Sequence, residues 1–135
     1  MKQIRILLAD DHNVMRKGLR LLLESQGDFS VVGEAADGRQ AVAKAEETKP
    51  DVVVLDISLP AGDGFLVAER LQTLAGSAAT PIIFMTASEN PGLRERAMKL
   101  GAVGFLKKPF DATSLADAIE SALSPGDNWR SSIAN

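Results

Sequence analysis

The stretch VVVLDISLP, residues 52–60, opens with four consecutive apolar residues and then places the carboxylate of Asp56 directly after Leu55. A short apolar run rich in β-branched valine is typical of a β-strand. Burying an ionised carboxylate without a partner would cost far more free energy than the apolar contacts of this strand recover. We therefore expect Asp56 to lie at an exposed strand end or beside other polar groups.

Similar short apolar runs alternate along the chain with stretches of helical periodicity. The runs predict strands over residues 4–9, 29–35, 51–56, 81–86 and 103–107. Between them, apolar residues recur at i, i+4 and i+7, which predicts helices that each carry one apolar stripe. The stripes comprise Met15, Leu19 and Leu22; Val67, Leu71 and Leu74; Leu93, Ala97 and Leu100; and Leu115, Ile119 and Ala122. A further helix with a weaker pattern is expected over residues 38–48.

Five strand–helix units in this order predict an α/β fold, a doubly wound parallel sheet with helices on both faces, because right-handed crossovers leave few other topologies. Asn90 and Asp111 are typical helix N-caps, with Pro91 as a first helical residue, and Gly101 is a typical helix end. The predicted domain covers residues 1–123. Residues 124–135 are polar and broken by proline and glycine, so we expect a loosely ordered tail.

Composition limits the function classes. The chain has 135 residues, 45% hydrophobic content, no cysteine and a formal net charge of -3. This length suits one domain, and the lack of cysteine excludes disulfides, thiolate metal sites and a cysteine nucleophile. The N-terminus holds neither a secretory signal nor a membrane span, so we expect a cytoplasmic protein without membrane contact. Without a basic run, this chain is not expected to bind nucleic acid directly.

Polar residues stand where the predicted strands end. In open α/β sheets, the ligand crevice lies beyond the carboxyl ends of the strands. Three carboxylates, a hydroxyl group and a lysine ammonium are therefore expected at one edge of the sheet. The residues at these strand ends are Asp10, Asp11, Asp56, Thr86, Lys107 and Lys108.

The chemistry of such a cluster is restrictive. Three carboxylates within a few ångströms repel one another, so the site must bind protons or recruit a cation. Ligands that are all oxygen atoms favour Mg²⁺ or Mn²⁺ over zinc. Beside a hard divalent ion, a carboxylate oxygen can attack a phosphoryl group while the metal and a lysine neutralise the other phosphoryl oxygens. The cluster therefore predicts a phosphoryl-acceptor site.

Over residues 3–123 the sequence resembles the receiver domains of two-component response regulators. Asp10 and Asp11 look like the acidic metal-binding pair of that family, and Asp56 in LDISLP looks like its phosphorylated aspartate. The remaining features of the resemblance are Thr86 in MTAS as the switch hydroxyl, Phe105 as the switch aromatic, and Lys108 in KKPF as the family's lysine.

The resemblance has implications for fold, cofactor and mechanism. It implies a flavodoxin-like sheet of five parallel strands in the order 2-1-3-4-5. It implies Mg²⁺ held by Asp11, Asp56 and the backbone carbonyl of Ser58, with Asp10 acting mainly through water. A histidine kinase or histidine phosphotransfer protein would donate the phosphoryl group to Asp56. The residues implied in phosphoryl binding and switching are Thr86, Ala87, Phe105, Lys108 and Pro109.

The implied switch would change a surface made by the fourth helix, the fifth strand and the fifth helix. A downstream output domain or a second copy of the chain would then read that surface. The opening RILLADDHNVMRKGLRLLLE, residues 5–24, looks like the receivers of helix-turn-helix transcription regulators. No output domain follows residue 123 in this sequence, so we expect either a lone receiver or a piece of a longer regulator.

Each site residue taken alone has a simpler interpretation. Asp11 could be only a helix N-cap, Thr86 a β-branched strand residue and Phe105 plain core. Lys107 is expected to be a solvated surface charge. His12, the only histidine, is not expected to have a chemical role, although imidazole can shuttle protons near neutral pH.

Rival function classes fit the sequence less well. A flavin or dinucleotide binder needs a glycine-rich first turn, and a P-loop NTPase needs G-x-x-x-x-G-K-[ST]; the chain has neither. The serious alternative is a haloacid-dehalogenase-like phosphatase, which also uses an aspartyl nucleophile. That family expects a second aspartate two positions on, where this chain has His12 and Ser58. We therefore expect a switch that loses its phosphoryl group slowly, not a turnover enzyme.

Overall fold

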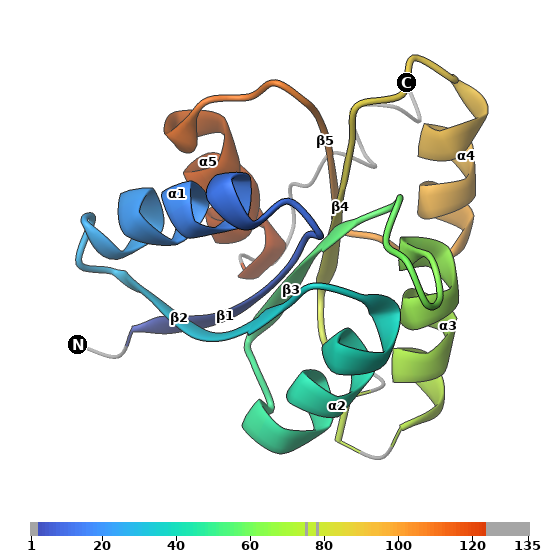
Figure 1. Ribbon diagram of the computed structural model, residues 1–135, viewed down its shortest axis with the longest axis horizontal. Coiled ribbons are helices and arrows are strands. Elements are labelled where there is room, and N and C mark those ends of the chain that lie inside the picture. The colour runs from blue at the N-terminus through green and yellow to red at the C-terminus, as the bar shows by residue number, and fades with distance from the viewer. Residues whose placement is uncertain (1–2, 75, 78, 124–135) are drawn as a thin grey trace.

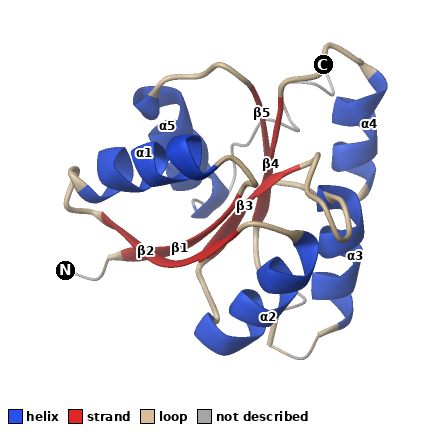
Figure 2. Ribbon diagram, in the orientation of Figure 1, coloured by secondary structure: helices blue, strands red, loops and turns tan. Residues whose placement is uncertain are grey.

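Five parallel strands form the centre of the protein in a computed structural model that describes residues 3–74, 76–77 and 79–123 (Figures 1 and 2). The spatial order is β2-β1-β3-β4-β5, so the predicted α/β fold and strand order are confirmed. The predicted strand positions agree with the structure to within one residue at each end. The strands are β1 (Ile4–Ala9), β2 (Phe29–Ala35), β3 (Val52–Asp56), β4 (Ile82–Thr86) and β5 (Gly104–Lys107).

Helices cover both faces of the sheet. Helices α1 and α5 pack on one face, and α2, α3 and α4 pack on the other (Figure 1). Each crossover returns the chain to the same edge, so all five strands end at one edge of the sheet. The helices are α1 (Asn13–Glu24), α2 (Gly38–Thr48), α3 (Gly64–Thr73), α4 (Gly92–Lys99) and α5 (Ala112–Leu123).

The central strand β3 contributes side chains to both hydrophobic cores. Val53 and Leu55 face α2, α3 and α4, while Val52 and Val54 face α1 and α5. All four are fully buried, and burial of each side chain contributes about 1.5–3 kcal/mol. A strand covered on both faces needs apolar residues at every position, which explains the unbroken run before Asp56.

The prediction for the buried face of α1 was wrong by about one position. Leu19 is buried as expected, but Met15 is 38% exposed and Leu22 is 49% exposed. The buried stripe consists of Arg16, Leu19 and Leu23 instead. Three consecutive leucines at residues 21–23 allow either face of the helix to point inward. Burial of the Arg16 side chain fixes which face does so, because it sets the rotation of α1 about its own axis. The buried or half-buried positions predicted for α3, α4 and α5 are confirmed.

Most of the predicted helix ends are confirmed. The Asp111 side chain accepts a hydrogen bond from the Ser114 N–H at 2.8 Å, as an N-cap does. The prediction for α4 was wrong by one residue: Pro91 is the N-cap and α4 begins at Gly92, although the Asn90 side chain accepts a hydrogen bond from the Gly92 N–H. Gly101 follows α4 with a φ of +84°, which favours glycine. The predicted loose tail, residues 124–135, lies outside the described residues.

Within the described ranges, no helix is long and apolar enough to cross a membrane. The cytoplasmic location stays a prediction from the sequence.

Candidate functional site

Three charged side chains meet where β1, β3 and β5 end. Asp10 follows β1 directly, Asp56 is the last residue of β3, and Lys108 follows β5. Their exposed fractions are 0%, 3% and 9%, respectively. Strands β1 and β3 are neighbours in the sheet, so their ends bring Asp10 and Asp56 together although 46 positions separate them in sequence. The convergence of these residues follows directly from the parallel topology.

Lys108 forms an ion pair with both buried aspartates. Its Nζ atom lies 2.9 Å from Asp10 Oδ2 and 2.7 Å from Asp56 Oδ2. The backbone also holds the lysine in place, because the Lys108 N–H donates a hydrogen bond to the Thr86 carbonyl at 2.7 Å. The lysine therefore neutralises part of the negative charge of the carboxylate cluster, which the sequence predicted to need protons or a cation.

The ion pairs shift the pKa values of two groups. Burial alone would raise the pKa of Asp10, but hydrogen bonds from Lys108 and from the His12 N–H outweigh it, so that pKa is lowered. Burial alone would lower the pKa of Lys108, but its contacts with Asp10 and Asp56 outweigh it, so that pKa is raised. The aspartate and the lysine are therefore both charged at neutral pH.

Asp11 and His12 complete a possible metal site. One potential ligand atom from each of Asp10, Asp11, His12 and Asp56 lies within 4.8 Å of the others. His12 Nδ1 is 3.1 Å from Asp10 Oδ1 and 3.2 Å from Asp11 Oδ1. Three carboxylates with a single lysine leave net negative charge, and carboxylate oxygens suit Mg²⁺. The three carboxylates therefore fit a hard divalent cation, and the His12 ring lies beside two of them.

A cavity of about 370 Å³ opens beside Asp56. The Ser58 N–H donates a hydrogen bond to Asp56 Oδ1 at 2.9 Å, so both carboxylate oxygens of Asp56 have a protein donor. The predicted residues Ser58, Ala87, Lys108 and Pro109 all line this cavity. Met15 of α1, which is partly exposed, also lines this cavity.

The two predicted switch residues lie on one face of the sheet. Thr86 is buried at the end of β4, and its Oγ1 accepts a hydrogen bond from the Ser88 N–H at 3.0 Å. Phe105 pairs across the sheet with Phe84, two residues before Thr86, and is half-buried beside α4. The Arg94 guanidinium carbon lies 5.2 Å from the centre of the Phe105 ring. Thr86 and Phe105 thus lie on the face of the sheet that α4 covers, and their switching roles stay predictions.

The neighbouring lysine, Lys107, does not reach the cluster. It is exposed and forms an ion pair with Glu89 on the surface, as expected for a solvated charge.

Comparison with known proteins assigns the family. A profile of the response regulator receiver domain matches residues 6–120. The chain belongs to this family. It is 40% identical over 120 residues to the transcriptional regulatory protein PdtaR of Mycobacterium tuberculosis, covering 89% of this chain and 57% of that protein. This receiver domain thus spans little more than half the length of that relative.

Solved structures agree with the assignment. The response regulator domain of Thermotoga maritima CheB is 34% identical, with a TM-score of 0.82 over 92% of this chain and all of that chain. A LuxR-family two-component response regulator from Aurantimonas is 34% identical, with a TM-score of 0.81 over 89% of this chain and 84% of that chain. The predicted flavodoxin-like receiver fold and two-component signalling function are confirmed, and the haloacid-dehalogenase-like phosphatase is not supported.

The receiver domain also contains a polar network that the sequence pattern did not predict. Arg16 Nε donates to Glu34 Oε1 at 2.9 Å, and Arg20 donates to the other Glu34 oxygen at 2.6 Å. Burial would raise the pKa of Glu34, but the hydrogen bonds from Arg20 and Arg16 outweigh it and lower that pKa. Arg16 also donates to the backbone carbonyl of Asp10. It therefore orients the peptide group that joins Asp10 to Asp11.

A signal for this network is present in the sequence, but it is weak. Arg16 stands three positions before Leu19 on the helix face that is buried, and a buried arginine needs an acidic partner. That partner, Glu34, lies 18 residues away on β2, and only the strand pairing brings it alongside.

Proposed function

We propose that Asp56 of this receiver domain accepts a phosphoryl group from a phosphohistidine of a histidine kinase or a histidine phosphotransfer protein. A carboxylate oxygen of Asp56 would attack the phosphorus, the P–N bond of the donor would break, and the donor imidazole would leave with its electron pair. The observation that carries the proposal is the contact of Lys108 Nζ with the carboxylates of both Asp10 and Asp56, beside an open cavity. The lysine supplies a cation beside the incoming phosphoryl group, and the cavity gives that group access to Asp56.

Asp11, Asp56 and the backbone carbonyl of Ser58 are proposed to hold Mg²⁺ or Mn²⁺, with Asp10 acting mainly through water. Support comes from the clustered ligand atoms of the three aspartates. A bound divalent ion would neutralise charge that develops on the phosphoryl oxygens. The protein's own part is to hold the ammonium of Lys108 against the carboxylate of Asp56.

Phosphorylation would redistribute the hydrogen bonds of Lys108 and Thr86. Phosphoryl attachment replaces the single negative charge of the Asp56 carboxylate by a phosphoryl group of about -2 charge with strong acceptor oxygens. Lys108 already donates to Asp56 and can follow the new oxygens, with Ala87 and Pro109 lining the same cavity. The Thr86 oxygen accepts a hydrogen bond from Ser88, which leaves its own proton available to donate.

The proposed output is a shift in population between two states of the α4-β5-α5 surface. Movement of Thr86 toward the phosphoryl group would draw the β4–α4 loop inward, and Phe105 could then fill the vacated space on the same face of the sheet. A downstream output domain or a second copy of the chain would read the changed surface. The comparisons are consistent with such partners, since the matched relatives include transcriptional regulators.

Slow loss of the phosphoryl group is part of the proposal. Ser58, which lines the cavity, is neither acid nor base, and the Ser88 hydroxyl already accepts a hydrogen bond from the Asn90 N–H. His12 also lines the cavity, but its Nδ1 faces the carboxylates of Asp10 and Asp11. Neither serine can act as a strong general base toward a water molecule that attacks the phosphoaspartate, and we propose that His12 stays engaged with the two aspartates.

The metal requirement gives the first test. Acetyl phosphate should label the parent protein in Mg²⁺ but not in excess chelator, and Asp11→Asn should lose the label because one metal ligand is removed. Asp117→Asn is the matched control, since Asp117 is an exposed aspartate of α5, and it should label like the parent. Equal labelling of the parent in Mg²⁺ and in chelator would contradict the metal site.

Arg16 and Arg20 form a matched pair for a second test. Both donate to Glu34, but only Arg16 reaches the Asp10 carbonyl. Arg16→Lys keeps the charge and loses the forked geometry, so Mg²⁺ affinity should fall about tenfold, as when a metal ligand loses its supporting contacts. Arg20→Lys should leave the affinity within about twofold.

The measurement is a Mg²⁺ titration of unphosphorylated protein, followed by the amide signals of Asp10 and Asp11. Thermal melting in chelator shows whether the two variants lose comparable stability. Equal Mg²⁺ affinities for Arg16→Lys and Arg20→Lys would show that Arg16 supports only the fold and not metal binding.

A further inference from the structure

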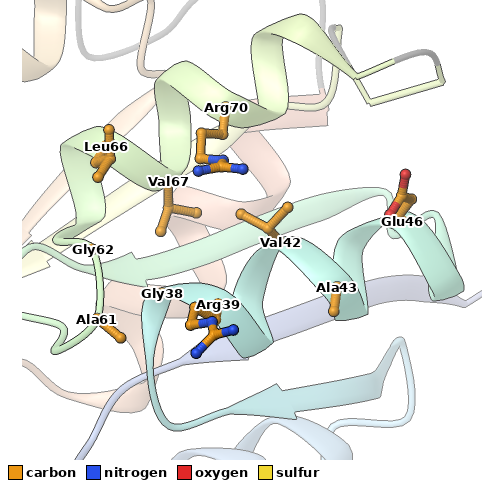
Figure 3. Close-up of a pocket in the computed structure, with 10 residues that line it drawn as sticks. All are labelled: Gly38, Arg39, Val42, Ala43, Glu46, Ala61, Gly62, Leu66, Val67 and Arg70. Carbon is orange, nitrogen blue, oxygen red and sulfur yellow. The ribbon is translucent and has the colours of Figure 1, made fainter.

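A second cavity lies between α2 and α3 (Figure 3). It encloses about 290 Å³ and shares no lining residue with the cavity beside Asp56. Val42 of α2 and Val67 of α3 form its apolar floor, and the β3–α3 loop closes one end with Ala61 and Gly62. We call this cavity the α2–α3 groove.

Backbone packing holds the walls of the α2–α3 groove in place. The Gly38 N–H, at the start of α2, donates a hydrogen bond to the Pro60 carbonyl at 2.8 Å. A Cβ atom added to Gly38 would lie 2.2 Å from the Gly62 carbonyl oxygen, so the loop touches the first turn of α2 directly. The groove is therefore formed before any partner binds, which lowers the conformational entropy that binding must overcome.

Two arginines flank the apolar floor. Arg39 rises from the first turn of α2 and Arg70 comes from α3, with Val42 and Val67 between them in the view of Figure 3. Among the arginines in the described ranges, these two alone have side chains that make no hydrogen bond, ion pair or ring contact. The others contact backbone carbonyls, acidic side chains or aromatic rings.

The unpartnered charges decide the chemistry of a binding partner. In a chain of net charge -3, two unpaired guanidinium groups on one groove create a local preference for an anion. Guanidinium groups bind carboxylates in a fork geometry, and the valines with the exposed Leu66 offer apolar contact alongside. Glu46 lines the far end, two helical turns from Arg39, so the preference for an anion is confined to the arginine end.

We propose that the α2–α3 groove binds a segment of a partner protein that presents a carboxylate side chain beside an apolar side chain. A volume of about 290 Å³ lies at the lower limit for small-molecule pockets, and it suits one or two protein side chains. The proposal concerns the unphosphorylated protein and does not depend on the chemistry of Asp56.

The test uses the whole ¹⁵N-labelled chain without phosphodonor and two blocked peptides, acetyl-Leu-Glu-Leu-amide and acetyl-Leu-Gln-Leu-amide. The glutamate peptide should shift amide signals of α2 and α3 in a saturable way, with a dissociation constant on the order of 1 mM. The glutamine peptide should bind about two- to fivefold more weakly, since it lacks the charge that the arginines attract.

Single substitutions assign the binding to the arginines. Arg39→Gln and Arg70→Gln should each weaken binding of the glutamate peptide about two- to fivefold. Glu46→Gln should strengthen it slightly, because a like charge is removed. Lys17→Gln, which removes an exposed cation from α1 on the other face of the sheet, should leave it unchanged.

Several results would overturn the proposal. These are the absence of saturable shifts, shifts confined to another surface, equal binding of the two peptides, or arginine variants that bind like the parent. Inorganic phosphate is the competing probe. If phosphate shifts the same amide signals with a lower dissociation constant than the glutamate peptide, the groove binds a small anion and the proposal of a protein segment is wrong.

Discussion

Asp56→Asn should remove all phosphoryl labelling of this receiver domain by acetyl phosphate in Mg²⁺. An amide oxygen is a far weaker nucleophile than a carboxylate oxygen, and among the aspartates that the structure describes Asp56 alone both contacts Lys108 and lines the cavity. Asp10 also contacts Lys108, but it is fully buried and is not a lining residue of that cavity. The label should therefore not move to Asp10.

The fold of Asp56→Asn should survive. Asp56 uses both oxygens as acceptors, one for the Ser58 N–H and one for Lys108, whereas asparagine has a single acceptor oxygen. A hydrogen bond to a charged group contributes about 1.5–3 kcal/mol, and reduced repulsion among the three carboxylates offsets most of its loss. The free energy of unfolding in chelator should thus change by less than about 1 kcal/mol, measured by urea denaturation. A variant that labels like the parent would contradict the assignment of Asp56.

Lys108→Met should destabilise the metal-free protein more than any surface substitution. It would leave Asp10 and Asp56 side by side and almost fully buried, without the cation that now contacts both. Removing one partner of an enclosed ion pair costs about 3–5 kcal/mol, and the adjoining cavity admits water, so we expect a loss of about 2 kcal/mol in chelator. Millimolar Mg²⁺ should restore part of that loss by replacing the missing positive charge.

Lys107→Met is the matched control for Lys108→Met. Lys107 is the preceding residue, but its side chain is exposed and pairs with Glu89 on the surface. Surface ion pairs contribute little, so this variant should lose less than about 1 kcal/mol by urea denaturation. Equal losses for the two variants would mean that the buried ion pairs at Asp10 and Asp56 do not stabilise the fold.

The site was predictable from the sequence because the sheet is parallel. Residues that follow different strands, such as Asp10 and Asp56, meet at one edge whenever the strands run in the same direction, so strand ends alone identify the cluster. The resemblance to the receiver family also separated the two neighbouring lysines, because Lys108, which stands directly before Pro109, matches that family's lysine.

Features that depend on side chains from distant elements were not predictable in the same way. The rotation of α1 depends on whether Met15 or Arg16 points inward. Arg16 does so because Glu34 on β2 accepts a hydrogen bond from its side chain. Apolar periodicity counts Arg16 as an exposed residue, so it selected the wrong stripe. The α2–α3 groove likewise depends on the close approach of Gly38 to the β3–α3 loop, which no local pattern indicates.

The most direct test of the account is the lifetime of the phosphoryl group in a single turnover. The protein is labelled with acetyl phosphate in Mg²⁺, the donor is removed, and the intact mass is followed with time. We predict one phosphoryl group per chain, absent from Asp56→Asn, that persists for minutes because neither Ser58 nor Ser88 is a strong base. Enzymes that turn over typically complete on the order of 1 to 1,000 cycles per second. A label that disappears within a second, with continuous release of phosphate from a small phosphomonoester, would contradict the account.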